Sequence, residues 1–472
     1  MTSPLFEAQA TGGVVARGGF EYQDAYLLQH FPKYLAQGAF SHAVCELLGD
    51  IEVRYHRPAG DTYCVLYEAK GYQLSEKDFW IEIDRFAELH DKAPDEYVSF
   101  VLVCTDYLNK LAPLFNKLDR LRGPGASLNS DSTIRASAEA DVVDTIVKLG
   151  RSRETAEFVL ARVSFVTYSQ ANVAGGFGEA VTEHLPAVED MTGSERAAFQ
   201  AACKQLVDGS TKGVVTRAAL ENALVQSAPS VAALWAASPT NVLLKAEPVQ
   251  GIEELALDVS DFNGDGRGAL GSAAWSKLQR RLEGLGAFVQ ASRPRRAVSI
   301  SAKQRMSLAC LVGFVFSATR GFTLQMAHNA GQVYDTANHD RSAQAYFALD
   351  AVPTELARSA EGVVAICCPN PGRADVLATT SAGSLVMTPK LFLESAVPIA
   401  DGATLNTAVA DAKGALATFR SQHQLDRIHL FVKAPSFFAM ALGHRLNGVG
   451  EVQLYDWVGH GYAATALIGR SC

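Results

Sequence analysis

Residues 47–72 read LLGDIEVRYHRPAGDTYCVLYEAKGY, and this stretch predicts two strands joined by a tight connection. The runs IEVRY and YCVLYEAK are rich in β-branched and aromatic residues, and HRPAGDT between them supplies the Pro, Gly and Asp that turns favour. Because side chains alternate between the two faces of a strand, Glu68 and Lys70 share one face. An ordinary buried strand does not carry two charges on one face, so these residues require a further explanation.

The length of the connection predicts how the two strands pair. If the hairpin is centred near Ala59, equal sequence distances place Asp50 opposite Glu68, with side chains about 5 Å apart, and make Lys70 a diagonal neighbour of Asp50. Two carboxylates this close repel each other, and a cation between them relieves the repulsion. Mg²⁺ (or Mn²⁺) fits this requirement, because Mg²⁺ takes oxygen ligands and needs only one or two protein carboxylates.

The hairpin therefore predicts a catalytic metal site. Asp50 and Glu68 are the expected metal ligands, and Lys70 is the residue expected to orient or deprotonate the attacking water. The alternative is that Glu68 and Lys70 form an exposed ion pair on a sheet edge.

A helix is predicted before the hairpin, in GGFEYQDAYLL (18–28). Gln23 lies three residues from Phe20 and four from Leu27, so it shares the inward face of this helix with apolar side chains. An inward amide needs a partner, and Gln23 is either a satisfied core residue or a polar contributor beside the metal. Glu46, four residues before Asp50, is either a further ligand or a charge at a strand edge.

These motifs resemble the PD-(D/E)xK nuclease superfamily, whose metal-binding Asp and Glu-x-Lys lie on adjacent strands. GDIEV followed by YEAKGY carries the resemblance, with Gly49 where the superfamily name has Pro. GGFEYQDAYLL is similar to the opening helix of a nuclease group that acts as an effector in bacterial anti-phage defence. The resemblance implies that Asp50, Glu68, Lys70 and Gln23 are catalytic residues.

Length and composition describe a globular protein of several domains. The chain has 472 residues, which is more than one hydrophobic core usually organises. It is 48% hydrophobic and 19% charged, and no apolar run approaches the roughly 20 residues of a membrane span. The first residues lack the basic and apolar regions of a signal peptide, and the eight cysteines are scattered. We expect a cytoplasmic protein with reduced cysteines and no membrane partner.

Charge is distributed unevenly along the chain. Residues 1–250 hold 22 Lys and Arg against 32 Asp and Glu, whereas residues 251–472 hold 20 against 18. An acidic nuclease half can still bind DNA through a local basic surface, and NKLAPLFNKLDRLRG (109–123) offers one on a predicted amphipathic helix. The alternative is that this helix simply presents a solvated face.

The pattern of elements changes in the middle of the chain. Helical patterns dominate to about Leu224, and the segment QSAPSVAALWAASPTN (226–241) is small-residue-rich and punctuated by Pro. After it, strands alternate with helices. We therefore expect a nuclease domain over 1–225, a linker over 226–241 and a second domain over 242–472.

The second half contains an internal repeat. Residues 299–325 and 429–455 align without a gap at an offset of 130, which places Lys303 on Lys433 and Gly313 on Gly443. Each copy predicts a strand, a short polar turn, a helix and a strand. Ligands bind at the carboxyl ends of strands in open α/β sheets, where helix N-termini attract phosphate, and both lysines fall there. They are either phosphate contacts or solvated loop residues.

The repeat resembles the SAVED domain, a fusion of two CARF-like Rossmann units that senses cyclic oligonucleotides. ISAKQRMSLACLVGF and IHLFVKAPSFFAMALGHRLN carry much of the resemblance. Together with the N-terminal motifs, the chain is similar to the CD-NTase-associated effector nucleases of CBASS anti-phage systems. This implies an α/β protein with a PD-(D/E)xK restriction-endonuclease-like domain, helical additions, and a C-terminal SAVED domain of two fused Rossmann units.

The resemblance also implies a function. A cyclic di- or trinucleotide binds the SAVED domain, drives self-association, and activates cleavage of double-stranded DNA with little sequence specificity. By position, the residues implied to line the ligand pocket are Lys303, Arg305, Lys433 and Ser436, with Tyr334 as a base-stacking partner. The alternative function is a nucleotide-responsive DNA-binding or scaffold protein that does not cut.

Overall fold

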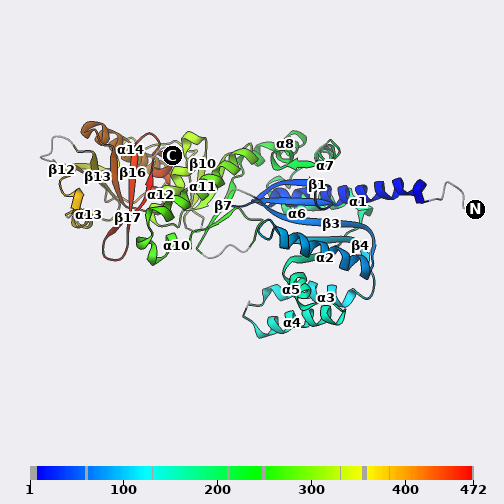
Figure 1. The fold of residues 1–472 in the computed structure, drawn as a ribbon. Coiled ribbons are helices and arrows are strands. Elements are labelled where there is room, and N and C mark those ends of the chain that lie inside the picture. The colour runs from blue at the N-terminus through cyan, green and yellow to red at the C-terminus, as the bar shows by residue number, and fades with distance from the viewer. Residues whose placement is uncertain are drawn as a thin grey trace, which may run out of the picture. The chain divides into compact units, whose positions relative to one another are not determined.

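The computed structural model forms two compact units, which divide between Trp235 and Ala236 (Figure 1). Residues 226–241, the expected linker, contain the helix α9 (Ala232–Ala237) and the beginning of the strand β7 (Thr240–Lys245). The structure describes residues 8–58, 62–129, 131–209, 213–246, 251–329, 331–352, 359–381 and 383–469.

The N-terminal unit is built on a six-stranded mixed sheet with the order β5-β4-β3-β2-β1-β6. Its strands are β1 (Phe40–Cys45), β2 (Ile51–His56), β3 (Thr62–Leu74), β4 (Tyr97–Tyr107), β5 (Val163–Thr167) and β6 (Val214–Thr216). The strands β2 and β3 are antiparallel, whereas β3, β4 and β5 run parallel to one another. The hairpin strand β3 therefore lies inside the sheet and not at its edge.

The predicted register of the hairpin is confirmed. Ile51 pairs with Tyr67 and His56 with Thr62, so every pair is centred on position 59. One further step of the same register places Asp50 opposite Glu68. The turn chemistry of the connection and the alternation of buried side chains were sufficient to predict this pairing.

Two helices cover opposite faces of this sheet. The helix α1 (Ala8–Ala36) packs on the face of Tyr67, whose ring centroid lies 5.7 Å from that of Tyr26. The helix α2 (Glu76–Lys92) begins at a Ser75 N-cap, which accepts a hydrogen bond from the Asp78 amide. Its apolar side chains share a core with Leu66, on the other face of β3. Glu68 and Lys70 therefore point towards α2.

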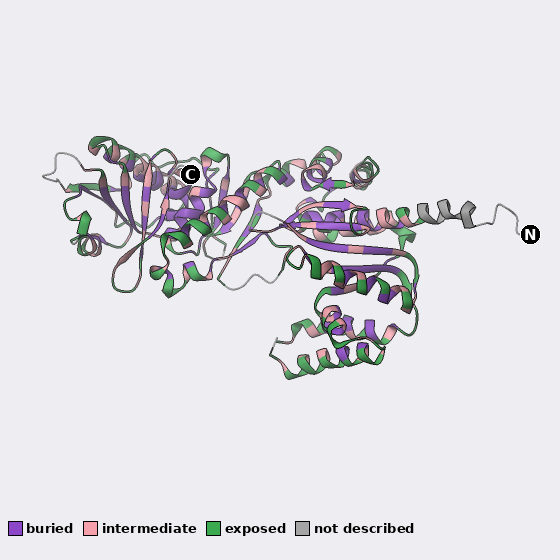
Figure 2. Cartoon of the chain, in the orientation of Figure 1, coloured by how far each residue is buried: buried purple, intermediate pink, exposed green. Residues whose placement is uncertain are grey.

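Further helices surround the sheet. The helices α3, α4 and α5 form a group connected through α5 to α2, and α6, α7 and α8 contact α1. Figure 2 shows that the strands are largely buried while the outer surface of α4 is exposed. The bounds of these helices are α3 (Ala112–Arg122), α4 (Thr133–Lys148), α5 (Arg153–Arg162), α6 (Val173–His184), α7 (Gly193–Asp208) and α8 (Arg217–Ser227).

The C-terminal unit contains two sheets, with the orders β11-β10-β9-β7-β8 and β12-β14-β13-β15-β16-β17. The first sheet adds to β7 the strands β8 (Ala256–Asp258), β9 (Ala297–Ser301), β10 (Thr323–Ala327) and β11 (Val333–Asp335). The second consists of β12 (Ala348–Val352), β13 (Glu361–Cys367), β14 (Lys390–Glu394), β15 (Arg427–Lys433), β16 (Glu451–Trp457) and β17 (Tyr462–Ile468). The helices of this unit are α10 (Ser260–Asn263), α11 (Ser272–Ser292), α12 (Met306–Val315), α13 (Arg373–Thr380), α14 (Gly402–His423) and α15 (Ser436–Arg445).

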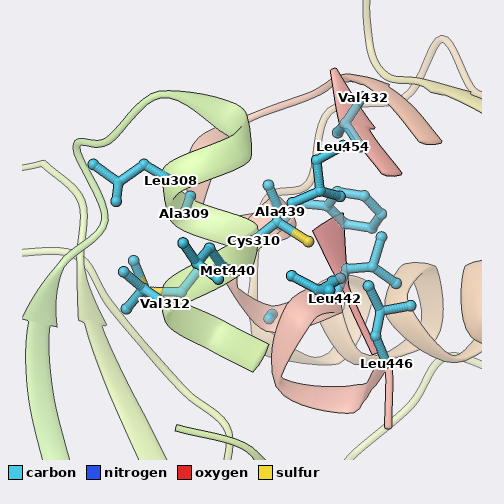
Figure 3. Close-up of a cluster of buried hydrophobic side chains, with 14 of the residues drawn as sticks. Leu308, Ala309, Cys310, Val312, Val432, Ala439, Met440, Leu442, Leu446 and Leu454 are labelled. Atoms are coloured by element: carbon cyan, nitrogen blue, oxygen red, sulfur yellow. The ribbon is translucent and has the colours of Figure 1, made fainter. Parts of the chain in front are cut away.

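The internal repeat is confirmed as two parallel strand-helix-strand units. The units β9-α12-β10 and β15-α15-β16 keep the offset of 130, since α12 spans 306–315 and α15 spans 436–445. The two helices pack against each other inside one hydrophobic core that includes strands of both sheets. Figure 3 shows Leu308 and Val312 of α12 and Leu442 of α15 within that core, with Leu446 directly after α15.

None of the helices in the described part of the chain is both long and apolar enough to span a membrane.

Candidate nuclease and ligand sites

Asp50 directly precedes β2, and Glu68 lies opposite it on β3, which extends beyond the start of β2. The carboxylate of Asp50 accepts a hydrogen bond of 2.7 Å from the backbone N–H of Ala69, which ties the two strands together beside Glu68. Glu68 is only 6% exposed. Burial, followed by the charge of Glu68, raises the pKa of Asp50 to about 7. The site therefore concentrates negative charge that a cation would stabilise.

Lys70 is held between two carboxylates. Its Nζ lies 2.8 Å from Oε1 of Glu68 and 2.9 Å from Oε1 of Glu82. Burial disfavours the charged ammonium, but the hydrogen bonds and charges of the two glutamates outweigh it and raise the pKa of Lys70. The alternative of an exposed pair at a sheet edge is wrong, because β3 is an interior strand and Glu68 is buried.

Sequence reasoning missed two members of this site, Glu82 and Arg85 of α2. Arg85 pairs with Glu68, donates to Oε2 of Glu82 at 2.9 Å, and donates to the carbonyl of Leu48 at 3.1 Å. We call Glu68, Lys70, Glu82 and Arg85 the Glu68 network. The sequence did contain a signal for Glu82, because this charged residue lies in the inward-facing apolar stripe formed by Phe79, Ile83 and Phe86.

The structure does not bring Gln23 to this network. Gln23 is half-buried on α1, which packs against the face of β3 opposite to Glu68 and Lys70. The predicted inward face of α1 is confirmed for Leu27, which is buried, but not for Phe20, which is 49% exposed.

Glu46 lies closer to the carboxylates. Its backbone N–H donates to the carbonyl of Asp50 at 3.1 Å, and its side chain is exposed. Partial burial, followed by the charge of Glu68, raises the pKa of Glu46.

The predicted basic surface on residues 109–123 is largely neutralised. Lys110 pairs with Glu76 at 3.0 Å, and Lys117 pairs with Asp141 at 2.8 Å. Arg122 donates to backbone carbonyls of α5. Tertiary partners that are distant in sequence bind Lys110, Lys117 and Arg122, whereas Arg120 is exposed, so most of the expected basic surface is engaged within the protein.

The carboxylates of Asp50 and Glu68 fit a hard divalent cation. Among the described residues there is no group of three or more His, Cys, Asp or Glu side chains arranged to hold a metal. Asp50 and Glu68 alone provide two carboxylates, which is the number of protein ligands that Mg²⁺ commonly takes. The pKa of Asp50 is raised first by burial and then by the charge of Glu68, and a cation bound by both carboxylates would oppose both effects.

A separate pocket of about 530 Å³ lies in the second sheet of the C-terminal unit. It is found at the carboxyl ends of β13, β14 and β15, where Lys433 pairs with Asp375 at 3.0 Å. The lining residues are Pro371, Gly372, Arg373, Ala374, Asp375, Leu377, Glu394 and Lys433. We call this the Lys433 pocket, and Ser436 follows it as the first residue of α15.

The equivalent position in the first repeat has a different environment. Lys303 and Arg305 are exposed and do not line the Lys433 pocket, and Arg305 is bonded to Asn263. The amide of Ser307 at the start of α12 donates to Asp456 at 2.9 Å. A carboxylate of the other repeat thus already occupies this helix start, whereas no side chain in the described part of the chain accepts a hydrogen bond from the first amides of α15.

The expected stacking role of Tyr334 does not fit its surroundings. Tyr334 is 3% exposed, and its ring stacks on that of Phe437 with centroids 4.1 Å apart. Its hydroxyl accepts a hydrogen bond from Gln332 at 2.6 Å. Phe437 is therefore the aromatic partner that the fold provides for this ring.

Comparison with known proteins assigns both units. Residues 11–212 match the family described as the Cap4 double-stranded DNA endonuclease domain. Residues 282–468 match the SAVED family, described as the SMODS-associated sensor domain fused to various effectors. The protein is thus of the class in which a DNA endonuclease is fused to a SAVED sensor, and the predicted fold class is confirmed.

Close relatives narrow this class. A CD-NTase-associated protein 4 from an Acinetobacter strain is 39% identical over 467 residues, which cover 99% of each chain, and one from Moraxella osloensis is 39% identical over 466 residues, again 99% of each. The solved Acinetobacter baumannii Cap4 SAVED/CARF-domain receptor with the cyclic trinucleotide 3′3′3′-cAAA superimposes with a TM-score of 0.88 and 36% identity, covering 96% of this chain and 99% of that one. The chain belongs to the CD-NTase-associated protein 4 family, the effector endonucleases of CBASS anti-phage defence.

The DNA endonuclease prediction is therefore confirmed over that of a non-cleaving scaffold. A nuclease domain of this kind indicates the use of a divalent metal ion.

Proposed function

We propose that Asp50 and Glu68 hold Mg²⁺ and that Lys70 acts on the attacking water when the protein cleaves double-stranded DNA. The observation that carries this assignment is the convergence of the three side chains at the β2-β3 hairpin, where the Asp50 carboxylate bonds the Ala69 amide and Lys70 bonds Glu68. A divalent ion supplies a Lewis acid that polarises the scissile phosphate and lowers the pKa of water.

The protein's own groups have separate roles in this proposal. Glu82 holds the Lys70 ammonium at 2.9 Å, so the lysine stays directed at the carboxylates and not at solvent. Arg85 restrains Glu68 and anchors it to the backbone at Leu48. Lys70 carries a positive charge that offsets charge developing on the phosphate, and its ammonium can orient the attacking water.

Cleavage is proposed to show little sequence specificity. Contacts to phosphates carry affinity but no base information, and each contact releases counterions. Activity should therefore fall steeply with added salt and produce a broad range of fragment ends.

We propose that a cyclic di- or trinucleotide binds at the Lys433 pocket and drives self-association. The pocket lies at the carboxyl ends of parallel strands, which is where α/β sheets bind ligands. The uncapped start of α15 leaves backbone N–H groups beside Lys433 for a phosphate. The solved relative with a bound cyclic trinucleotide supports a ligand of this class.

A plasmid assay tests the proposal. Purified protein is incubated with supercoiled DNA and Mg²⁺, with each member of a panel of cyclic di- and trinucleotides, and with excess chelator as a control. We expect cleavage only with metal and one class of ring. Equal cleavage without a ring, or with chelator present, would contradict the proposal.

A further inference from the structure

A second recess in the C-terminal unit is cationic and belongs to neither of the sites described above. Its volume is about 120 Å³, and it lies between α14, the end of α15 and the loop after β11. The lining residues are His339, Arg341, Asn406, Val409, Ala410, Lys413 and Arg445. We call this recess the α14 pocket. Three of its side chains are cationic, one is an imidazole, and none is a carboxylate.

The positive charges of the α14 pocket have no ion-pair partner among the residues that the structure describes. Among the described residues, no carboxylate forms an ion pair with Arg341, Lys413 or Arg445. Arg445 approaches the ring nitrogen of His339 at 3.3 Å. Burial, followed by the like charge of Arg341, lowers the pKa of the Arg445 guanidinium. Gathering these groups is unfavourable by itself, and an anion between them would reverse the sign of that interaction.

The pocket is built by a loop that is bonded to α14. Three side chains of α14 hold the backbone of this loop, so His339 and Arg341 are carried on a fixed segment. Asn406 donates to the carbonyls of Asn338 at 2.8 Å and Asp340 at 3.0 Å, Thr407 accepts from the Ser342 amide at 2.8 Å, and Asp411 accepts from the Tyr346 amide at 2.7 Å. Asp411, the carboxylate of α14, accepts this bond and does not line the pocket.

The chemistry of the donors indicates the ligand. Two guanidinium groups offer planar pairs of N–H donors that match phosphate oxygens, and an ammonium adds a point charge. A single carboxylate has only one negative charge and two oxygens, which is too little to neutralise three cations and to accept hydrogen bonds from all of them. We propose that the α14 pocket binds a terminal phosphate, of the kind carried by inorganic phosphate, pyrophosphate or the end of a nucleotide.

The α14 pocket is distinct from the Lys433 pocket. Ser436 begins α15 beside the Lys433 pocket, whereas Arg445 ends the same helix at the α14 pocket. Nine residues of α-helix separate them by about 14 Å. Lys413 and Arg445 are half-buried in a small recess, and a terminal phosphate can enter such a recess more deeply than a phosphodiester of a DNA duplex.

Arg445 has a second explanation, since a cation in the last turn of a helix is favourable without any ligand. The proposal therefore depends on Arg341 of the loop and Lys413 in the middle of α14, for which helix termini provide no reason. These two residues are the ones to change.

Calorimetric titration of the full chain with pyrophosphate, in chelator and at constant ionic strength, tests the proposal. We expect wild-type binding, and at least a tenfold loss of affinity in Arg341→Gln with Lys413→Gln. The single variant Arg341→Gln changes only an exposed side chain, so it provides a folded protein in which affinity should also fall. Lys277→Gln, an exposed charge on α11, is the matched control and should bind as the wild type does.

Three results would overturn the proposal. One is unchanged pyrophosphate affinity in the double variant. Another is binding that is lost in Lys433→Gln but kept in the double variant, which would assign the anion to the Lys433 pocket. The third is a wild type that does not bind pyrophosphate, and a loss of affinity for duplex DNA in the double variant would then assign the surface to nucleic acid.

Discussion

Gly313 and Gly443 occupy equivalent positions of the internal repeat, and each lies against the backbone of the other's helix. A Cβ at Gly313 would fall 1.9 Å from the carbonyl oxygen of Met440, and a Cβ at Gly443 would fall 2.0 Å from that of Cys310. Cys310 and Met440 are themselves 130 residues apart, so one contact is repeated in both directions. The two Rossmann units thus associate as the halves of an isologous dimer do.

This contact predicts that Gly443→Ala destabilises the SAVED unit. The added methyl group meets backbone, which cannot rotate away, so α12 and α15 must separate within a close-packed core. We expect a loss in unfolding free energy of at least the roughly 1–3 kcal/mol typical of overpacking. Gly414→Ala in α14, where no atom lies within 4 Å of the new methyl group, is the control and should stabilise by up to about 1 kcal/mol. Urea unfolding of both variants measures the difference, and equal stabilities would contradict the packing argument.

Lys70→Ala and Glu68→Ala should each abolish DNA cleavage and leave folding and cyclic nucleotide binding intact. Both side chains lie at the hairpin that holds Asp50, and general acid–base groups commonly contribute about 10²–10⁴ in rate. Lys92→Ala, at the exposed end of α2, should cut at the wild-type rate. Plasmid nicking and circular dichroism provide the two readouts. Full activity in Lys70→Ala would remove it from the site.

Arg85→Gln should lower the Mg²⁺ concentration needed for half-maximal cleavage several-fold. The guanidinium pairs with Glu68, so its removal leaves more negative charge for a divalent ion. Lys77→Gln makes the same charge change on the exposed surface of α2 and should not shift the requirement. Metal titrations of nicking and of thermal stability measure the effect. An unchanged or higher requirement would show that Arg85 does not compete with the cation.

Charge reversal at Lys433 should abolish both ligand-induced assembly and DNA cleavage, whereas Lys70→Ala should abolish cleavage alone. A bound ring shifts the assembly equilibrium only by its differential affinity for the two states, so removing its contacts removes both outcomes. Lys303→Glu should act in the same direction but more weakly, because Asp456 already caps α12. Linear fragments should bind less tightly than the ring.

Light scattering with and without ligand tests this mechanism. A wild-type protein that cleaves on ligand addition yet stays monomeric would refute assembly. Lys433→Gln removes the positive charge without placing a second carboxylate beside Asp375. It therefore distinguishes the loss of a ligand contact from added charge repulsion.

His444 should make the SAVED unit less stable in mild acid. Burial lowers the pKa of His444 to about 4, although its hydrogen bond to the carbonyl of Phe316 opposes this. Below its unfolded pKa of about 6.5 the unfolded chain binds a proton that the folded chain does not. Unfolding free energy should therefore fall from about pH 6.5 towards pH 4, by at most about 3 kcal/mol.

His444→Asn keeps a donor for the Phe316 carbonyl and removes the titration. Its unfolding free energy should be lower near neutrality but should change less between neutrality and mild acid than that of the wild type. Urea unfolding across this range measures both slopes. Parallel slopes would show that His444 does not control the acid sensitivity.

Local patterns in the sequence determined the hairpin and the repeat. The register around Asp50 and Glu68 follows from strand alternation and a connection of defined length, and both are properties of neighbouring residues. The offset of 130 between Gly313 and Gly443 is visible because each repeat must form the same strand-helix-strand unit. These local features are sufficient to predict the positions of the carboxylates, Lys70 and the two repeat lysines in their strands and turns.

Tertiary structure decided the partners of those residues. Glu82 reaches Lys70 and Arg85 reaches Glu68 because α2 packs on one face of β3, whereas α1, which carries Gln23, packs on the other face. Asp456 accepts a hydrogen bond from the Ser307 amide, 149 residues away in sequence, at the start of α12. This contact gives Lys303 a different environment from Lys433, although the two lysines are equivalent in the repeat. Periodicity assigns a side chain to a face, but the groups that meet it there depend on long-range packing, and no local pattern encodes that.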